Sequence, residues 1–210
     1  MEYGYAGNVK KIIKTTYNDI LKTDSIQIPK GNKADVIETF FINSHQNIDS
    51  FLTQRLLPTG DTFSYLRKFH FEELKRKSWE AYSMDNEKLL SGKIDWSTDK
   101  EFDEKVFYQT GKLKFNLITS LNDSYRIFYI HIKGFDESGK LTQNSTQEFS
   151  FTDSGNLNTL TTTNILENKI EKKTYQYLSK DKRGNPTEML ITKQTDNSSN
   201  LIKLEYQYYD

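Results

Sequence analysis

The side chains that could perform acid–base or metal chemistry are few in this sequence. Its three histidines, His45, His70 and His131, belong to no HExxH motif. His131 lies in an alternating run beside Tyr129 and Lys133, which favours a sheet histidine over a metal ligand. There is no cysteine, which excludes disulfides, thiolate metal sites and a cysteine nucleophile. There is also no glycine-rich phosphate loop, so we predict neither a metal site nor a cofactor site.

Two pairs of adjacent carboxylates are present, Glu72/Glu73 and Asp103/Glu104. Successive residues of a strand point to opposite faces of a sheet, so neither pair converges by itself. A hydrolase with two carboxylates drawn from distant parts of the chain stays open as a third function class. No catalytic residue is predicted, and we expect a protein that is not an enzyme.

A basic cluster is interleaved with aromatic residues. Arg67-Lys68 and Lys75-Arg76-Lys77 alternate with Phe69, Phe71 and Trp79. Such a pattern can bind single-stranded nucleic acid through phosphate contacts and base stacking. Glutamates within the same segment, together with a formal net charge of zero for the chain, favour a solvated strand-and-turn face instead. We expect no nucleic-acid partner.

Tyrosine is the residue type most suggestive of binding. A tyrosine ring offers a large flat surface with one polar tip, which suits contact with a protein or a glycan. Packing of the same rings against a covered side of the sheet is the alternative. Six tyrosines on neighbouring predicted strands form the candidate binding face: Tyr125, Tyr129, Tyr175, Tyr177, Tyr206 and Tyr208.

Composition favours sheet and leaves the compartment open. Thirteen Tyr and thirteen Phe accompany abundant Thr, and these residues favour strands. No run of about 18 apolar residues could span a membrane as a helix. Residues 1–11 lack the apolar segment of a signal peptide. A cytoplasmic protein is expected if Met1 is the native start; a cell-envelope or secreted protein, with a possible lipid anchor in its precursor, is expected if a signal preceded it.

A recurring glycine pattern predicts hairpin turns. In residues 134–157 an aromatic, a polar triplet, a glycine and an apolar residue two positions later occur twice, around Gly139 and Gly155. A type I turn that ends in a left-handed glycine explains this pattern, and the aromatic and apolar residues would face each other across the hairpin. The segments 167–169 and 197–200 would turn on Asn instead. The turn glycines predicted in this way are Gly7, Gly92, Gly111, Gly139, Gly155 and Gly184.

The runs between these turns predict strands joined in chain order. The clearest, 125–133, is apolar at even positions and rich in Tyr at odd ones. We predict one all-β domain over residues 1–210, an antiparallel meander of sequential long hairpins that forms an open, rolled or barrel-like sheet, with at most one short helix, at 71–84. The predicted strands are 8–17, 25–28, 34–42, 48–57, 62–71, 125–133, 146–151, 157–166, 169–178, 187–195 and 201–209.

These motifs resemble the YD/RHS-type hairpin repeat. Tyr175-Gln-Tyr177 through Gly184-Asn-Pro186, and the terminal Glu205-Tyr-Gln-Tyr-Tyr-Asp210, carry the resemblance, although most copies here have Phe where the family has Tyr. The opening residues 7–17 are similar to the first mature strand of YD-like secreted or lipid-anchored proteins of Bacteroidota. The resemblance implies a β-sheet protein outside the cytoplasm and no catalytic residues.

Two non-catalytic functions follow as hypotheses. The first is an envelope or extracellular binding or scaffold module that presents the tyrosine face to a protein or glycan. The alternative is an immunity-type protein that neutralises a partner toxin, since YD/RHS-like domains accompany such systems. A neighbouring toxin gene would support the second hypothesis, and a lipobox cysteine just before residue 1 would place the protein in the envelope.

Overall fold

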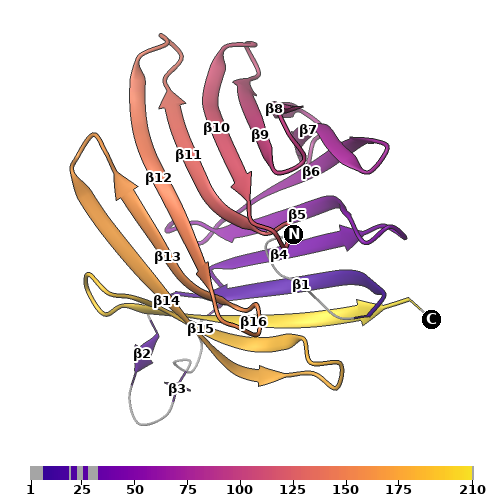
Figure 1. Ribbon diagram of the computed structural model, residues 1–210, viewed down its shortest axis with the longest axis vertical. Coiled ribbons are helices and arrows are strands. Elements are labelled where there is room, and N and C mark those ends of the chain that lie inside the picture. Colours follow the sequence, from indigo (N-terminus) through magenta and orange to yellow (C-terminus); the bar gives the residue numbers. More distant parts are fainter. Residues whose placement is uncertain (1–6, 19, 23–25, 28–32, 210) are drawn as a thin grey trace. The chain divides into compact units, whose positions relative to one another are not determined.

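The computed structural model of the chain describes residues 7–18, 20–22, 26–27 and 33–209, which form strands and turns only (Figure 1). The predicted all-β antiparallel meander is therefore confirmed. The alternative helix at 71–84 is wrong: β6 continues to Glu72, Glu73 and Leu74 form a tight turn, and β7 follows. Glu73 takes the left-handed conformation that this turn requires (φ 55°), and β-favouring aromatic residues flank it on both sides.

The strands divide between two compact units, which are described separately. The central unit comprises Arg67–Lys172, and the terminal unit comprises the described residues up to Leu66 together with 173–209. The two boundaries fall within β6 (Thr62–Glu72) and β14 (Lys169–Lys180). That the chain behaves as one domain stays a prediction.

The central unit is an antiparallel sheet in which sequence neighbours pair with each other. Its complete strands are β7 (Lys75–Ser83), β8 (Lys88–Trp96), β9 (Glu101–Tyr108), β10 (Leu113–Leu121), β11 (Ile127–Phe135), β12 (Leu141–Phe151) and β13 (Leu157–Asn164).

In the terminal unit the first strand pairs with the last. β1 lies between β16 and β4, so the two ends of the chain are joined in one sheet (Figure 1). Of the predicted strand 25–28, only Ile26–Gln27 is described, as β3, which pairs with β2. The complete strands of this unit are β1 (Val9–Tyr17), β2 (Leu21–Lys22), β3 (Ile26–Gln27), β4 (Val36–Ile42), β5 (Ile48–Leu56), β15 (Pro186–Lys193) and β16 (Ser199–Tyr208).

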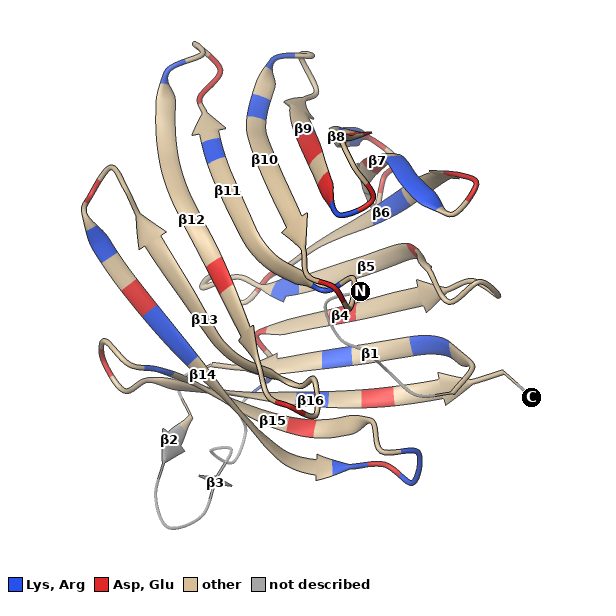
Figure 2. Cartoon of the chain, viewed as in Figure 1, with Lys and Arg blue, Asp and Glu red and all other residues tan. Residues whose placement is uncertain are grey.

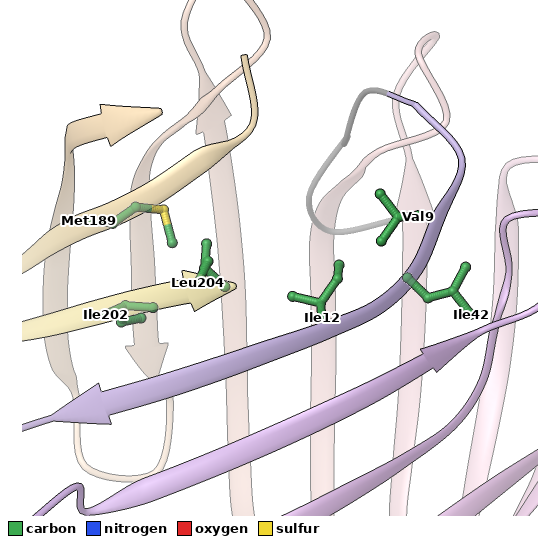
Figure 3. Packing of buried hydrophobic residues seen from close by; sticks show 6 residues of the cluster. All are labelled: Val9, Ile12, Ile42, Met189, Ile202 and Leu204. Carbon is green, nitrogen blue, oxygen red and sulfur yellow. The ribbon is translucent and has the colours of Figure 1, made fainter. Parts of the chain in front are cut away.

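The terminal unit contains a cluster of buried apolar side chains on one side of these paired strands (Figure 3). Alternation along each strand brings the side chains to this common side. The members of the cluster are Val9, Ile12, Ile42, Met189, Ile202 and Leu204.

Eight hairpins share one turn geometry. In each, the first turn residue donates its N–H to the carbonyl of the fifth residue, and the fourth donates its N–H back to the first. The fourth residue has positive φ and is Gly60, Gly111, Gly139, Gly155 or Gly184 in five turns, and Gln46, Asn86 or Tyr125 in three. The first residues of the turns are Asn43, Leu57, Ser83, Tyr108, Asn122, Asp136, Thr152 and Asp181.

The repeat around Gly139 and Gly155 thus has the structural origin that its sequence predicts. Phe135 pairs with Leu141, and Phe151 pairs with Leu157, each directly across a bulged hairpin. In the Gly139 turn, the side chain of Asp136 also accepts hydrogen bonds from the backbone N–H groups of Ser138 and Lys140. The polar residues of the repeat therefore replace the backbone partners that a turn lacks.

One glycine prediction is wrong. Gly92 lies within β8, where its φ is not positive and where a Cβ atom would meet the indole ring of Trp79. The absence of a side chain here leaves room for a ring rather than for a turn. Gly7 has positive φ (86°) at a bend before β1, as predicted, but the aromatic of its motif, Tyr3, lies outside the described residues.

Candidate binding face of the central unit

The registers of the central sheet divide its side chains into two contrasting faces, because directly paired residues lie on the same side. For example, one row of directly paired residues crosses β8 to β11 and consists of Trp96, Phe102, Thr119 and Ile130. The side chains that make this side apolar, here called the apolar face, come from the seven strands β7 to β13: Trp79, Ile94, Trp96, Phe102, Val106, Phe115, Leu117, Ile130, Ile132, Phe149 and Leu160.

Burial differs between the two ends of the apolar face. Trp79, Ile94 and Val106, on β7–β9, are at most 5% exposed. The members on β10–β13 are only half-buried. A sheet face of this composition is normally covered, so its β10–β13 part is the strongest candidate for contact with another molecule.

Two glycines allow aromatic rings to lie flat on the apolar face. Gly92 is paired with Trp79, and Gly134 is paired with Phe115. A Cβ on Gly134 would come within 2.9 Å of the Phe115 ring. Each ring therefore lies over backbone that bears no side chain and fills the space that a side chain would occupy.

A single carboxylate, Glu104, lies among the rows of the apolar face. Its Oε1 accepts a hydrogen bond of 2.5 Å from Nε1 of Trp79, and the Trp79 ring lies 3.8 Å below the guanidinium of Arg67. The contacts between charged groups and the indole orient Trp79 and offset the cost of placing Glu104 on this side.

The opposite face of the central sheet is polar and internally paired. Lys105 lies 3.7 Å from Asp103, and His131 contacts Oδ1 of Asn144 at 2.8 Å. Acidic and basic positions are both present among these strands and their turns (Figure 2). This face therefore has the character of a solvated surface, and His131 is a hydrogen-bonded sheet histidine, as its sequence context favours.

Another network on the central unit is centred on Glu80. The pKa of this carboxyl is lowered by hydrogen bonds from Lys88, at 2.5 Å, and from Tyr82, at 2.7 Å. His70 lies 3.8 Å from the same carboxylate. All of these groups are accessible to solvent, and the network joins three strands rather than enclosing a substrate.

The predicted tyrosine face is not one surface. Tyr125 is the left-handed residue of the β10–β11 turn (φ 56°) rather than a strand residue, because β11 begins at Ile127. Tyr129 is half-buried on the polar face of the central unit, where it is paired with Glu148. Neither residue belongs to the paired rows that form the apolar face.

The other four tyrosines belong to the terminal unit, where they lie on the side of the sheet that carries the buried cluster. Tyr177, Tyr206 and Tyr208 pack against its buried cluster, and Tyr175 is paired with Ile191 on the same side. Burial raises the pKa of Tyr206, whose hydroxyl donates to the carbonyl of Pro186 at 2.9 Å. These half-buried rings therefore contribute to the packing of the sheet.

The basic cluster is also used within the chain. Lys75 pairs with Asp99 at 2.5 Å, Lys77 pairs with Glu72 at 3.2 Å, and Arg76 lies 3.8 Å over the ring of Phe69. This arrangement favours the interpretation as a strand-and-turn face over nucleic-acid binding. Adjacent Asp103 and Glu104 lie on opposite faces, as expected, and do not form a carboxylate pair.

Sequence reasoning noticed the alternation that builds the apolar face but did not interpret it as a site. The even positions of the 125–133 run include Ile130 and Ile132, which lie on the apolar face of β11, whereas Phe128 falls in a bulge between Ile127 and Tyr129. Among the described residues, no cluster of three or more His, Asp or Glu could hold a metal ion. Those residues also contain no helix of the length and hydropathy needed to cross a membrane.

Comparisons with known proteins show similarity at the level of the fold. Neither a family model nor a curated protein matches the sequence. The structure is similar to a porin-like protein from Bacteroides uniformis ATCC 8492, with a TM-score of 0.51 and 10% identity over 95% of this chain and 98% of the other.

Two further solved structures match with lower scores. A porin-like protein from Bacteroides vulgatus ATCC 8482 has a TM-score of 0.47 and 9% identity, over 97% of this chain and 100% of the other. The LolA superfamily protein NE2245 from Nitrosomonas europaea has a TM-score of 0.35 and 7% identity, over 100% of this chain and 90% of the other. The resemblance to YD/RHS repeats is not reproduced among these neighbours and stays a prediction.

Proposed function

We propose that this protein is a non-enzymatic binding module of the bacterial envelope or exterior, and that it holds the apolar part of a ligand on the apolar face of its central unit. The observation that carries the proposal is the incomplete burial of that face from β10 to β13. Leu117, Ile130 and Ile132 form its middle, on paired strands, and all three are only half-buried.

A ligand on the apolar face would gain binding free energy from several half-buried side chains at once. Complete burial of an exposed Leu, Ile or Phe side chain contributes about 1.5–3 kcal/mol. When a ligand covers a side chain that is already half-buried, a part of this free energy is still gained. Several neighbouring side chains of this kind are enough for micromolar binding after the cost of association. A ligand with an apolar chain or ring system is therefore favoured over one that is polar throughout.

The absence of catalysis and the envelope location belong to the same proposal. Asp103, Glu148 and His131 lie on the polar face of the central sheet, where Asp103 and His131 contact neighbouring side chains, and this supports a binding role rather than catalysis. The similarity of the sequence motifs to secreted or lipid-anchored proteins supports a location outside the cytoplasm. Fractionation of cells that express the full native gene tests the location, and recovery in the cytosolic fraction alone would contradict it.

The binding test exploits two adjacent residues on opposite faces. Leu117 lies on the apolar face, and Ile118 lies on the polar face with 39% of its surface exposed. Leu117→Lys should weaken the binding of the apolar fluorophore N-phenyl-1-naphthylamine by about tenfold or more, and Ile118→Lys should leave it unchanged, since one buried apolar contact is worth about 1.4 kcal/mol or more. Equal binding by both variants, or no binding by the wild type, would contradict the proposed function.

A further inference from the structure

Next to the half-buried apolar residues, the same face carries a group of uncharged polar side chains. Gln143, Ser145 and Gln147 alternate along β12, and Thr162 on β13 is paired with Gln147. These four residues are here called the amide–hydroxyl strip. Through the β11–β12 register, Ser145 lies opposite Ile132 and Gln147 opposite Ile130, so the strip borders the aliphatic part of the face directly.

The four side chains of the strip can form hydrogen bonds and are themselves uncharged. Ser145 is 4% exposed and accepts a bond of 3.0 Å from Nε2 of Gln143, whereas Gln147 and Thr162 are half-buried. Amide and hydroxyl groups both donate and accept hydrogen bonds. The nearest charge on β12, Glu148, is paired with Tyr129 and therefore points to the polar face.

The uncharged donors and acceptors of the strip favour a neutral, hydroxylated head group over a charged one. A phosphate or carboxylate placed on the strip would lose hydration and would meet no cation among the four side chains of the strip, which is costly in a half-buried position. Hydroxyl groups would meet partners for both their donor and their acceptor roles. Neighbouring strands are about 5 Å apart, and alternate side chains on one strand are about 7 Å apart, so the strip is broad enough for a sugar ring.

We propose that the amide–hydroxyl strip binds the neutral, hydroxyl-rich head group of an amphiphile whose apolar part lies on the apolar face. This inference rests on the proposed function, since it takes the apolar face as the ligand-binding site. It goes further by naming the ligand class, a glycosylated amphiphile, and the residues that distinguish it from charged amphiphiles.

The test compares three amphiphiles with the same twelve-carbon chain, each below its critical micelle concentration: dodecyl maltoside, dodecylphosphocholine and dodecanoate. Isothermal titration of the full chain should give the lowest Kd for dodecyl maltoside, by about tenfold, because two or more neutral hydrogen bonds are gained. The double variant Gln147→Leu/Thr162→Val should lose this preference and still bind dodecanoate.

The matched control is Thr163→Val, on the residue next to Thr162. Thr163 is paired with Thr146, which places it on the polar face, so the preference for dodecyl maltoside should be unchanged. Equal affinity for the three amphiphiles, or a preference for a charged one, would overturn the inference and leave the proposed function standing. Failure of the folded wild type to bind any of the three would overturn both.

Discussion

Glycine serves two purposes in this chain, and only one of them is visible in the sequence. Gly139 and Gly155 have positive φ at the ends of turns, and the spacing of the aromatic and apolar residues around them predicts these turns from the sequence. Gly92 has the same apolar residue two positions later, yet it lies under the ring of Trp79 within a strand. Local spacing cannot reveal this role, because the ring comes from a neighbouring strand.

Alanine substitutions should separate the two roles. Gly92→Ala places a methyl group against the Trp79 ring and should reduce the free energy of unfolding by about 2 kcal/mol through overpacking. Gly139→Ala meets no neighbouring atom within 4 Å and should cost about 1 kcal/mol, from the left-handed backbone alone. Urea denaturation measures both, and the Trp79 emission should change only in the Gly92 variant. An equal loss with unchanged emission would contradict the assignment.

Asp181 connects the β14–β15 turn to the last strand. Its carboxylate accepts a hydrogen bond from the hydroxyl of Tyr208 and others from the backbone N–H groups of Asn185 and Arg183. Burial alone would raise the pKa of Asp181, but these hydrogen bonds outweigh it and lower the pKa below the ordinary 3.8. Asn185, buried at 2% exposure, also donates to the Tyr208 hydroxyl at 2.7 Å.

This network predicts a pH dependence of stability. Because the pKa of Asp181 is lower in the folded than in the unfolded chain, its carboxylate stabilises the fold above the ordinary value of 3.8, and that stabilisation is lost as the pH falls through the folded-state pKa. The difference in unfolding free energy between wild type and Asp181→Asn should be largest near pH 6 and should shrink below about pH 4. A difference that stays constant with pH would show that the charge of Asp181 is unimportant.

At the scale of elements, the hairpin is the unit that the sequence predicts best. Turns with glycine or Asn carry a local signal, and the strands between them alternate clearly. The turn at Tyr125 lacks glycine or Asn at its left-handed position, where a bulky aromatic is unusual. The sequence therefore places Tyr125 in a strand. In the structure, the backbone N–H groups of Ser124 and Arg126 donate hydrogen bonds to Oδ1 of Asn122, which helps to close the turn.

The strained turn leads to a stabilising substitution. Tyr125→Gly removes the steric cost of a side chain at φ 56° and should raise the free energy of unfolding by about 0.5–1 kcal/mol, after the entropy cost of glycine in the unfolded chain. Asn86→Gly in the β7–β8 turn is the control and should gain less, since Asn tolerates this conformation well. Thermal melts that show a larger gain for the Asn86 variant would contradict this ranking.

At the scale of the whole molecule, alternation and turn chemistry establish the strand order but not the assignment of faces to functions. The sequence shows which residues share a side of β11. It does not show that Trp79 and Phe115 cover glycines, or that three tyrosines pack on the buried cluster of the terminal unit. Those facts depend on cross-strand register over many strands, and a register shift of one residue would exchange the faces.

The predicted single domain has a simple thermodynamic test. One domain should unfold in one cooperative step, so intrinsic tryptophan emission, which reports the central unit, should follow the same urea transition as far-UV circular dichroism, which reports all strands. Two transitions with separate midpoints would show that the central and terminal units are independent domains.

The central claim, that an apolar ligand lies on the apolar face, is tested most directly by quenching of tryptophan emission. Both tryptophans, Trp79 and Trp96, lie on this face, and Trp96 is the more accessible, 4.7 Å from the ring of Phe102. A dodecyl chain that carries a nitroxide group should quench the emission saturably, unlabelled dodecyl maltoside should reverse the quenching, and Trp96→Phe should remove most of the signal. Quenching that rises without saturation, or that the Leu117→Lys variant leaves unchanged, would contradict the claim.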